Sequence, residues 1–478
     1  MSNQPPGREV LVWLLPYIML ALETLHPQTS ADLGWQLRTG AWVMEHGTVP
    51  ETDPFCWTSQ GRRWVAYSWL YGVVLHSLYQ TGGLFAILVA RVGLAVAIAA
   101  SLQRLIARHE PRPLVGVTLL TLAVGSLGPL FTDRPWLVTI LFSTWTLSAI
   151  LELRAGHAAA WWLGLLPPVY VLWANTHIQF VYGLGLLSLG CLAGAVEWLR
   201  GQGGWLLGRL LGLTAACSLA TLATPYHYQL YGVVLEYATQ RGAYQWVEEL
   251  RAPRPTTMLW GEWLGVVLAS WGVVAVLRRR SLFAGLLLAA GMAAFLHSRR
   301  DLWLLVLASV AAVLAAPARP ASAGPAPVPA LRWHRIAFGA VVAGLFVVLG
   351  SLRGLTPDRL EAALASRYPV GAAAWLQEQT IPGPLYNDFD WGGFLIWRLP
   401  RLPVCIDGRT NLHGDARLRR NLDVWSNVAD PFSDPDLAQA RVVLGPATAP
   451  LTAQLRQEPD FRVVYDDGLA TVLVRKSE

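Results

Sequence analysis

Long apolar stretches alternate with short polar stretches through the first three quarters of the chain. From residue 83 to about residue 352 the apolar runs recur at about 17 to 23 residues, the length that crosses a hydrocarbon core of about 30 Å as a helix. After residue 353 Asp, Arg and Asn become common, and no apolar run is long enough to span. The pattern predicts a polytopic α-helical membrane domain, residues 1–352, followed by a soluble domain, residues 353–478.

The predicted topology depends on one short segment. Residues 66–80, AYSWLYGVVLHSLYQ, would form a helix of about 22 Å, too short to span, and their aromatic side chains suit the headgroup layer. If this helix lies in the interface, the arginines of the later loops collect on one side, which the positive-inside rule identifies as cytoplasmic. About eleven spans then follow, at residues 9–26, 83–104, 113–131, 135–152, 158–174, 178–199, 205–223, 259–277, 281–297, 301–316 and 333–352.

The same topology assigns the remaining segments. The external loop of residues 27–82 and the soluble domain lie on the non-cytoplasmic side, and the Pro/Ala-rich residues 317–332 form a cytoplasmic linker. The first apolar run, preceded by Arg8, resembles a signal peptide, but no small-residue cleavage site follows it. A retained first helix is therefore predicted.

Composition supports a membrane protein and argues against a nucleic-acid partner. The chain is 54% hydrophobic and only 14% charged, whereas soluble proteins carry about 25% charged residues. Its net charge of +6 comes from arginines spread among loops rather than gathered on one face. The four cysteines show no metal-ligand spacing; Cys56 and Cys405 either pair or remain thiols, and the sequence leaves both open.

Alternating short elements follow residue 355. Residues 357–369 and 370–379 predict short helices, and residues 391–399 predict another. GPLYN (383–387), PVCIDG (403–408) and RVVLG (441–445) predict strands. Residues 461–475 predict a hairpin that turns at Asp466-Asp467-Gly468. A small α/β layer fold is expected.

The first loop concentrates carboxylates beside the bilayer and carries a resemblance. Asp32 shortly follows the first span, TGAWVMEHG (39–47) forms a first juxtamembrane helix, and ETD (51–53) precedes a second one in residues 66–83. This order resembles the membrane-embedded glycosyltransferases of the GT-C fold, which use polyprenyl-phosphate-linked sugar donors. Arg91 lies part-way into the next span, as an arginine does in the aminoarabinose-transferring members.

A second resemblance lies in the soluble domain. NDFDWGGFLIWRLPRLPVCIDGRTNL (387–412) is similar to the WWDYG region of oligosaccharyltransferase catalytic subunits. The motif positions are held by Phe389, Asp390, Trp391 and Gly392, and Arg401, Pro403, Asp407 and Thr410 follow.

Two departures bear on a metal site. Mannosyltransferase-like members have an Asp-Glu pair early in the first loop, whereas Leu33 follows Asp32 here. Oligosaccharyltransferases have a paired acidic motif in their second external loop, whereas FTDRP offers Asp133 alone. The metal ligands are therefore unknown, and a divalent cation such as Mg or Mn stays open.

The chemistry implied by the resemblance assigns roles to residues. A carboxylate deprotonates or orients the acceptor, and cations stabilise the leaving phosphate, which the lipid tail holds at headgroup depth. Asp32 is the expected catalytic carboxylate, with helix N-capping as its simpler role. The donor phosphate is assigned to Arg91, Arg299 and Arg300, which could instead snorkel or anchor the helices at the interface.

The remaining candidates form two groups. A second acidic site is assigned to Glu51, Asp53, Asp133 and Glu248, although ETDPF is also typical of a turn. Acceptor binding is assigned to Asp390, Trp391 and His177, although turn geometry and interfacial anchoring explain them as well.

The predicted function is transfer of a sugar or oligosaccharide from a polyprenyl-phosphate-linked donor to a glycan, lipid or protein acceptor. The predicted location is the non-cytoplasmic face of a bacterial inner membrane. The alternative is a non-catalytic GT-C-like envelope scaffold or lipid-binding membrane protein. A transporter is less favoured, because ionisable residues do not collect near the bilayer midplane and no internal repeat is evident.

Overall fold

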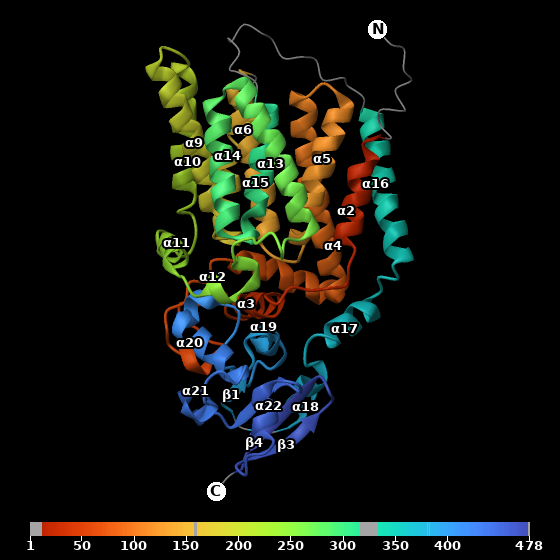
Figure 1. Cartoon of the computed structure of the whole chain (residues 1–478), viewed down its shortest axis with the longest axis vertical. Helices are drawn as coiled ribbons and strands as arrows, with labels where there is room; N and C mark the ends of the chain where they lie inside the picture. Colours follow the sequence, from red (N-terminus) through yellow and green to blue (C-terminus); the bar gives the residue numbers. More distant parts are fainter. Residues whose placement is uncertain (1–11, 157–159, 316–331, 380, 382, 477–478) are drawn as a thin grey trace. The chain divides into compact units, whose positions relative to one another are not determined.

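A computed structural model describes residues 12–156, 160–315, 332–379, 381 and 383–476 (Figure 1). The chain divides into two compact units. The first unit contains the chain up to residue 26 and residues 88–227 and 249–355; the second contains residues 27–87, 228–248 and those from 356 onward. Arg8 and residues 317–331 of the predicted linker lie outside the described residues.

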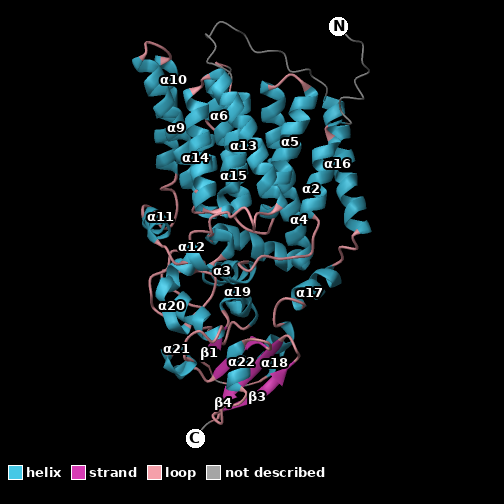
Figure 2. Cartoon of the chain, viewed as in Figure 1, coloured by secondary structure: helices cyan, strands magenta, loops and turns pink. Residues whose placement is uncertain are grey.

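The first unit is a bundle of apolar helices (Figure 2). Its helices are α2 (Leu14–Thr24), the later part of α4 (Trp69–His109), α5 (Pro113–Leu127), α6 (Trp136–Arg154), α7 (Ala160–Leu163), α8 (Leu166–Thr176), α9 (Phe180–Leu199), α10 (Gly204–Ala220), α13 (Trp260–Arg279), α14 (Leu282–His297), α15 (Leu302–Leu314) and α16 (Arg332–Leu352). The short 3-10 turns η2 (Gly128–Leu130) and η4 (Arg299–Asp301) connect helices, and η3 (Glu248–Leu250) crosses from one unit to the other in sequence.

The burial pattern of this bundle is that of a structure surrounded by hydrocarbon. Every residue of α15 is buried, and α15 packs against α5, α6, α13 and α14. The peripheral helices instead expose large apolar side chains such as Leu192, Val267 and Leu277. Exposed apolar surface on this scale is costly in water and favourable in lipid. The fold is therefore a polytopic α-helical membrane bundle.

Each of the eleven predicted spans overlaps a helix of the structure. By length and composition, five described helices qualify as spans, or up to six if one bent pair is counted as a single span. The shortfall arises partly because apolar helices such as α2, α10 and α14 are shorter than 18 residues. In addition, the predicted span 158–174 is divided between α7 and α8, where Pro167 and Pro168 begin a new helix. Proline lacks the N–H that would continue the preceding helix and is favoured in a first turn. The number of crossings stays a prediction.

The predicted boundary between the short helix of residues 66–80 and the span that follows it is present. Within α4 the backbone leaves helical geometry at Gly82 and Gly83, and Gly83 has a φ of 59°. A left-handed φ of this kind favours glycine. Residues up to 87 belong to the second unit and those from 88 to the first. The interfacial position of residues 66–80 stays a prediction.

The second unit combines helices with a four-stranded sheet (Figure 2). Its helices are α3 (Leu33–His46), the first part of α4, η1 (Trp57–Ser59), α11 (Gln229–Thr239), α12 (Ala243–Trp246), α17 (Pro357–Ala365), α18 (Val370–Glu378), α19 (Phe389–Arg398), α20 (Thr410–Trp425), η5 (Pro431–Ser433), α21 (Pro435–Gln439) and α22 (Pro450–Leu455). The sheet order is β1 (Leu385–Asn387), β2 (Val442–Pro446), β4 (Ala470–Arg475) and β3 (Phe461–Asp466). β1 and β2 are parallel, and the other two pairs are antiparallel.

Most of the elements predicted for the soluble part are confirmed, including the hairpin of β3 and β4. The strand predicted at residues 403–408 is wrong, because this segment forms only an isolated bridge between Val404 and Cys56. The Asn387 side chain causes the difference. Its Oδ1 accepts the Cys405 N–H at 2.8 Å, and its Nδ2 donates to the Ile406 carbonyl at 2.8 Å. The backbone groups that a sheet ladder would use are already paired.

Close glycine contacts position α3 within the second unit. A Cβ at Gly40 would lie 2.1 Å from the Gly72 carbonyl oxygen, and one at Gly34 would lie 2.2 Å from that of Gly393. Glycine therefore permits backbone-to-backbone contact of α3 with the first part of α4 and with α19. The start of α3, which carries Asp32, is fixed by these contacts.

Candidate functional site

Asp32 lies at the start of α3 and against the loop that follows residue 406. It occupies the N-cap position, but its side chain makes no capping hydrogen bond. Instead, its Oδ1 accepts a hydrogen bond from Trp35 Nε1 at 3.1 Å. The same oxygen lies 2.7 Å from the position that a Cβ on Gly408 would occupy. Asp32 is partly buried, so the carboxylate retains some access to ligands.

Behind this loop lies a set of buried polar side chains, which we term the buried ionic array: Asp53, Cys56, Asp407, Arg409 and His413. Arg409 donates from Nη1 to Asp53 at 2.8 Å, and from Nη2 and Nε to Asp407 at 2.7 and 2.8 Å. Cys56 Sγ and His413 Nε2 lie 2.9 and 3.1 Å from Asp407 Oδ2. The array joins the first loop to the loop before α20.

The electrostatics of the array are set by burial and by one guanidinium. Burial alone would raise the pKa of Asp407, but Arg409 and His413 outweigh it and hold this pKa well below its usual range. Burial, followed by the charge of Asp407, raises the pKa of the Cys56 thiol well above its usual value. Asp407 is therefore an anion and Cys56 a neutral thiol.

Part of this array has the spacing of a metal site. The ligand atoms of Cys56, Asp407 and His413 lie within 4.8 Å of one another. However, Arg409 Nη2 lies 2.7 Å from Asp407 Oδ2 and 3.3 Å from Cys56 Sγ. A guanidinium in this position repels a second cation, and a neutral thiol is a poor ligand. The residues therefore do not fit a divalent cation unless Arg409 moves, and no reaction step is assigned to a metal.

The four carboxylates assigned to a second acidic site occupy different surroundings. The Asp53 carboxylate accepts hydrogen bonds from Phe55 N–H and Ser59 Oγ in addition to Arg409, as expected for the turn in ETDPF. Glu51 is exposed. Asp133 belongs to the first unit, and Glu248 lies at the unit boundary. Among the described residues, none of the four belongs to a group of three metal-ligand side chains.

The arginines assigned to the donor phosphate lie in the first unit. Arg91 is buried; its Nη2 donates to the carbonyls of Thr24 and His26 at 2.9 and 2.5 Å, and its Nη1 lies 3.9 Å from Asp133. These contacts tie the end of α2 to α4.

Arg299 makes a bidentate ion pair in the same unit. Its Nε and Nη2 donate to the two carboxylate oxygens of Glu262 at 2.7 and 2.9 Å. Its neighbour Arg300 is partly buried in η4, before Asp301, whose carboxylate accepts from Tyr182 at 2.9 Å.

The residues assigned to the acceptor differ in exposure. Asp390 is exposed in the first turn of α19, whereas Trp391 is buried. His177 is also buried, and its Nδ1 lies 2.7 Å from Thr139 Oγ1 within the first unit.

Asp388 was not among the predicted site residues. It is the N-cap of α19 and accepts the Asp390 N–H at 2.9 Å. Burial, together with the charge of Asp390, raises the pKa of Asp388 to about 7. The helix was predicted to begin at residue 391, whereas α19 begins at Phe389, so the predicted boundary did not mark Asp388 as the N-cap.

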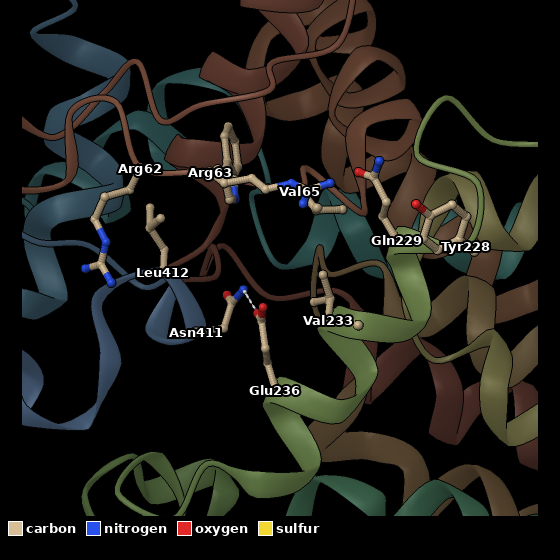
Figure 3. Close-up of a pocket in the computed structure, with 11 residues that line it drawn as sticks. Arg62, Arg63, Val65, Tyr228, Gln229, Val233, Glu236, Asn411 and Leu412 are labelled. Atoms are coloured by element: carbon tan, nitrogen blue, oxygen red, sulfur yellow. Dashed lines mark hydrogen bonds between the residues drawn. The ribbon is translucent and has the colours of Figure 1, made fainter.

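A cavity of about 560 Å³ lies elsewhere in the second unit (Figure 3). Its walls come from residues 62–65, one face of α11 and the start of α20. In Figure 3, the Arg62 side chain runs downward at the left, the Arg63 side chain extends toward Val65 at the top, and Asn411 and Glu236, joined by a hydrogen bond, lie below them. Sequence reasoning did not select either arginine, because the contribution of α11 to this cavity is not visible in the sequence.

Neither a protein-family model nor a curated protein matches the chain in sequence. Three solved structures are similar in fold. The archaeal oligosaccharyltransferase AglB from Archaeoglobus fulgidus, in complex with an inhibitory peptide and a dolichol-phosphate, is 10% identical, with a TM-score of 0.51 over 92% of this chain and 69% of its own. ArnT from Cupriavidus metallidurans is 16% identical, with a TM-score of 0.51 over 98% of this chain and 97% of its own.

The third is the arabinofuranosyltransferase AftD from Mycobacteria, 13% identical with a TM-score of 0.53. The match covers all of this chain but only 42% of AftD. The chain shares its overall fold with these three structures. The predicted fold class is thereby confirmed: a polytopic membrane bundle with a small α/β part.

Proposed function

We propose that the protein is a membrane glycosyltransferase that transfers a sugar or oligosaccharide from a polyprenyl-phosphate-linked donor to an acceptor. The main support is the position of Asp32 on the first loop of a chain whose fold is similar, over almost its whole length, to three transferases. One of these was solved with a dolichol-phosphate. The proposed location is the non-cytoplasmic face of an inner membrane, with the second unit on that side.

In the proposed reaction the acceptor nucleophile attacks the anomeric carbon of the donor sugar. The bond from this carbon to the phosphate oxygen breaks, and polyprenyl phosphate leaves with the electron pair. The Asp32 carboxylate accepts or orients the proton of the acceptor. Asp32 suits this role because it is partly accessible, whereas Asp53 and Asp407 are buried and paired with Arg409.

The donor phosphate is assigned to Arg91, Arg299 and Arg300. In the structure Arg91 donates hydrogen bonds to backbone carbonyls and Arg299 to Glu262, so phosphate binding by these two requires an exchange of partners.

On the acceptor side, the exposed Asp390 is proposed to contact the acceptor, and the buried Trp391 supports the turn that presents it. His177 has a buried partner in Thr139 and takes no step.

A non-catalytic scaffold or lipid-binding protein is the second candidate. It is favoured by the position of Arg409, whose Nη2 contacts both Asp407 and Cys56 and would repel a cation bound to them. The two candidates therefore differ in what they predict for Asp32 variants. If Asp32 catalyses transfer without a resident cation, its substitution removes the product; if the protein is a scaffold, the product is unchanged.

Product analysis of membranes separates the two candidates. Membranes from cells with the wild-type protein, the Asp32→Asn variant or no protein would be compared for glycosylated products by mass spectrometry. A transferase predicts that one product is absent both without the protein and with Asp32→Asn. The control is Asp430→Asn, a surface carboxylate that caps η5, since asparagine preserves the cap. An Asp32→Asn variant that is inserted, folded and makes the wild-type product would favour the scaffold.

A further inference from the structure

The cavity in the second unit carries charge that the proposed reaction does not use. We term it the arginine pocket and define it by Arg62, Arg63, Trp64, Gln229, Glu236 and Asn411. Its volume of about 560 Å³ is within the range of small-molecule sites. Asp32 is not among the residues that line it.

Two cations face this pocket without protein partners. Arg62 and Arg63 are exposed, and among the described residues neither guanidinium makes an ion pair or a hydrogen bond. The carboxylate in the lining, Glu236, accepts instead from Asn411 Nδ2 at 3.4 Å. An arginine fork has the geometry to bind phosphate through two parallel hydrogen bonds. The two arginines follow one another in the chain and extend in different directions (Figure 3), and two positive charges in the lining of one cavity favour an anionic ligand.

Contacts within the second unit hold two walls of the pocket in place, and on one side the buried ionic array makes them. The Arg409 guanidinium lies 4.4 Å from the centre of the Trp64 ring, and it also binds Asp53 earlier in the same loop. On the opposite wall, Tyr237 of α11 donates to Asn411 Oδ1 at 3.0 Å. The segment that carries Arg62 and Arg63 is thus fixed on one side, which lowers the entropic cost of ordering a binding site.

We propose that the arginine pocket binds a phosphate group of the acceptor. The identification of the ligand as the acceptor rests on the proposed function; binding of the phosphate does not. Gln229 and Asn411 offer amide groups for the hydroxyls of a sugar or a glycerol next to the phosphate. The phosphate belongs either to a water-soluble molecule or to a membrane lipid headgroup, and both sources present the same chemistry.

The test measures binding without any donor. Full-length protein in phosphatidylcholine nanodiscs is titrated with glycerol 3-phosphate by calorimetry, with glycerol as the uncharged comparison. In a second arm, nanodiscs containing phosphatidylglycerol are used, and the lipid retained by the protein is counted by native mass spectrometry. The Arg62→Gln/Arg63→Gln variant should weaken glycerol 3-phosphate binding by about 10- to 100-fold, since charged hydrogen bonds are lost, or remove a retained phosphatidylglycerol.

The matched control is Arg441→Gln/Arg462→Gln, which removes the same charge from two exposed arginines of the sheet region. Loss in the first arm alone supports a soluble phosphate, and loss in the second alone supports a lipid. Arg62→Lys/Arg63→Lys should bind with intermediate strength, because charge remains but the fork is lost. Wild-type behaviour of the glutamine variant in both arms, or equal weakening by the control, overturns the proposal. Neither arm requires transfer, so failure of the proposed function leaves this result standing.

Discussion

A single carboxylate, Asp32, accepts a hydrogen bond from Trp35 and lies close to Gly408 in the same unit. Gly408 leaves room for the Asp32 carboxylate. A Cβ at this position would lie 2.7 Å from Asp32 Oδ1, so a side chain there would displace the carboxylate. The position of Asp32 was predicted from its place after the first span. The role of Gly408 was not, because a contact between residues so far apart in the sequence is a property of the fold.

The Gly408→Ala variant should displace Asp32 and reduce transfer by about 100-fold, the typical effect of misplacing a reactive group by about 1 Å. Its unfolding temperature should change little, because the displaced carboxylate is partly exposed. Gly212→Ala in α10 is the control, since a Cβ there meets nothing within 4 Å. Transfer rates of both variants in nanodiscs give the comparison; wild-type activity of Gly408→Ala would show that Asp32 need not occupy this position.

Among the elements, the array centred on Arg409 connects the loop after α3 to the loop before α20. Arg409→Met leaves the buried Asp53 carboxylate without its cation and leaves Asp407 with His413 alone. Breaking a buried ion pair in this way destabilises by about 3–5 kcal/mol, so the unfolding midpoint in detergent should fall clearly. Arg462→Met, at an exposed position, should stay within about 0.5 kcal/mol of the wild type. An unchanged midpoint for Arg409→Met would mean that the array does not hold these loops together.

The start of α19 predicts a pH dependence. Since the pKa of the Asp388 carboxyl is raised to about 7, its contribution to stability is fully present below its unfolded pKa of about 4. This contribution is lost as the pH rises through about 7. Asp388→Asn keeps the cap acceptor and remains neutral. It should therefore unfold at a higher temperature than the wild type at pH 8, with a smaller difference at pH 5. A difference independent of pH would contradict this, and Asp430→Asn serves as the control.

Element prediction succeeded where the signal is local. Helix α19 follows an aspartate N-cap, and the β3–β4 turn contains Gly468 with a φ of 84°; both features are readable from neighbouring residues. The strand predicted at residues 403–408 failed because its backbone groups are paired with the Asn387 side chain and with Phe55. Such pairings are set by the tertiary structure and have no periodic signature in the sequence.

For the whole molecule, the alternation of apolar and polar runs was sufficient to predict a membrane bundle and a small α/β part. The composition of the second unit was not predictable in this way. It includes residues 27–87 and 228–248 as well as the chain from residue 356, and the Asp53–Arg409 ion pair joins residues 356 positions apart. Likewise, the sequence placed Arg91 within a span but did not show that the carbonyls of Thr24 and His26 would accept hydrogen bonds from it.

The amount of polyprenyl phosphate released during transfer is the measurement that tests the central proposal most directly. Purified protein in nanodiscs would be supplied with polyprenyl-phosphate-linked monosaccharides and membrane extract as acceptor, and the freed lipid phosphate measured by mass spectrometry. The wild type should release it, Asp430→Asn should match the wild type, and Asp32→Asn should be slower by about 10²- to 10⁴-fold, the usual contribution of a general base. Equal release by Asp32→Asn and the wild type would contradict a catalytic role for this carboxylate.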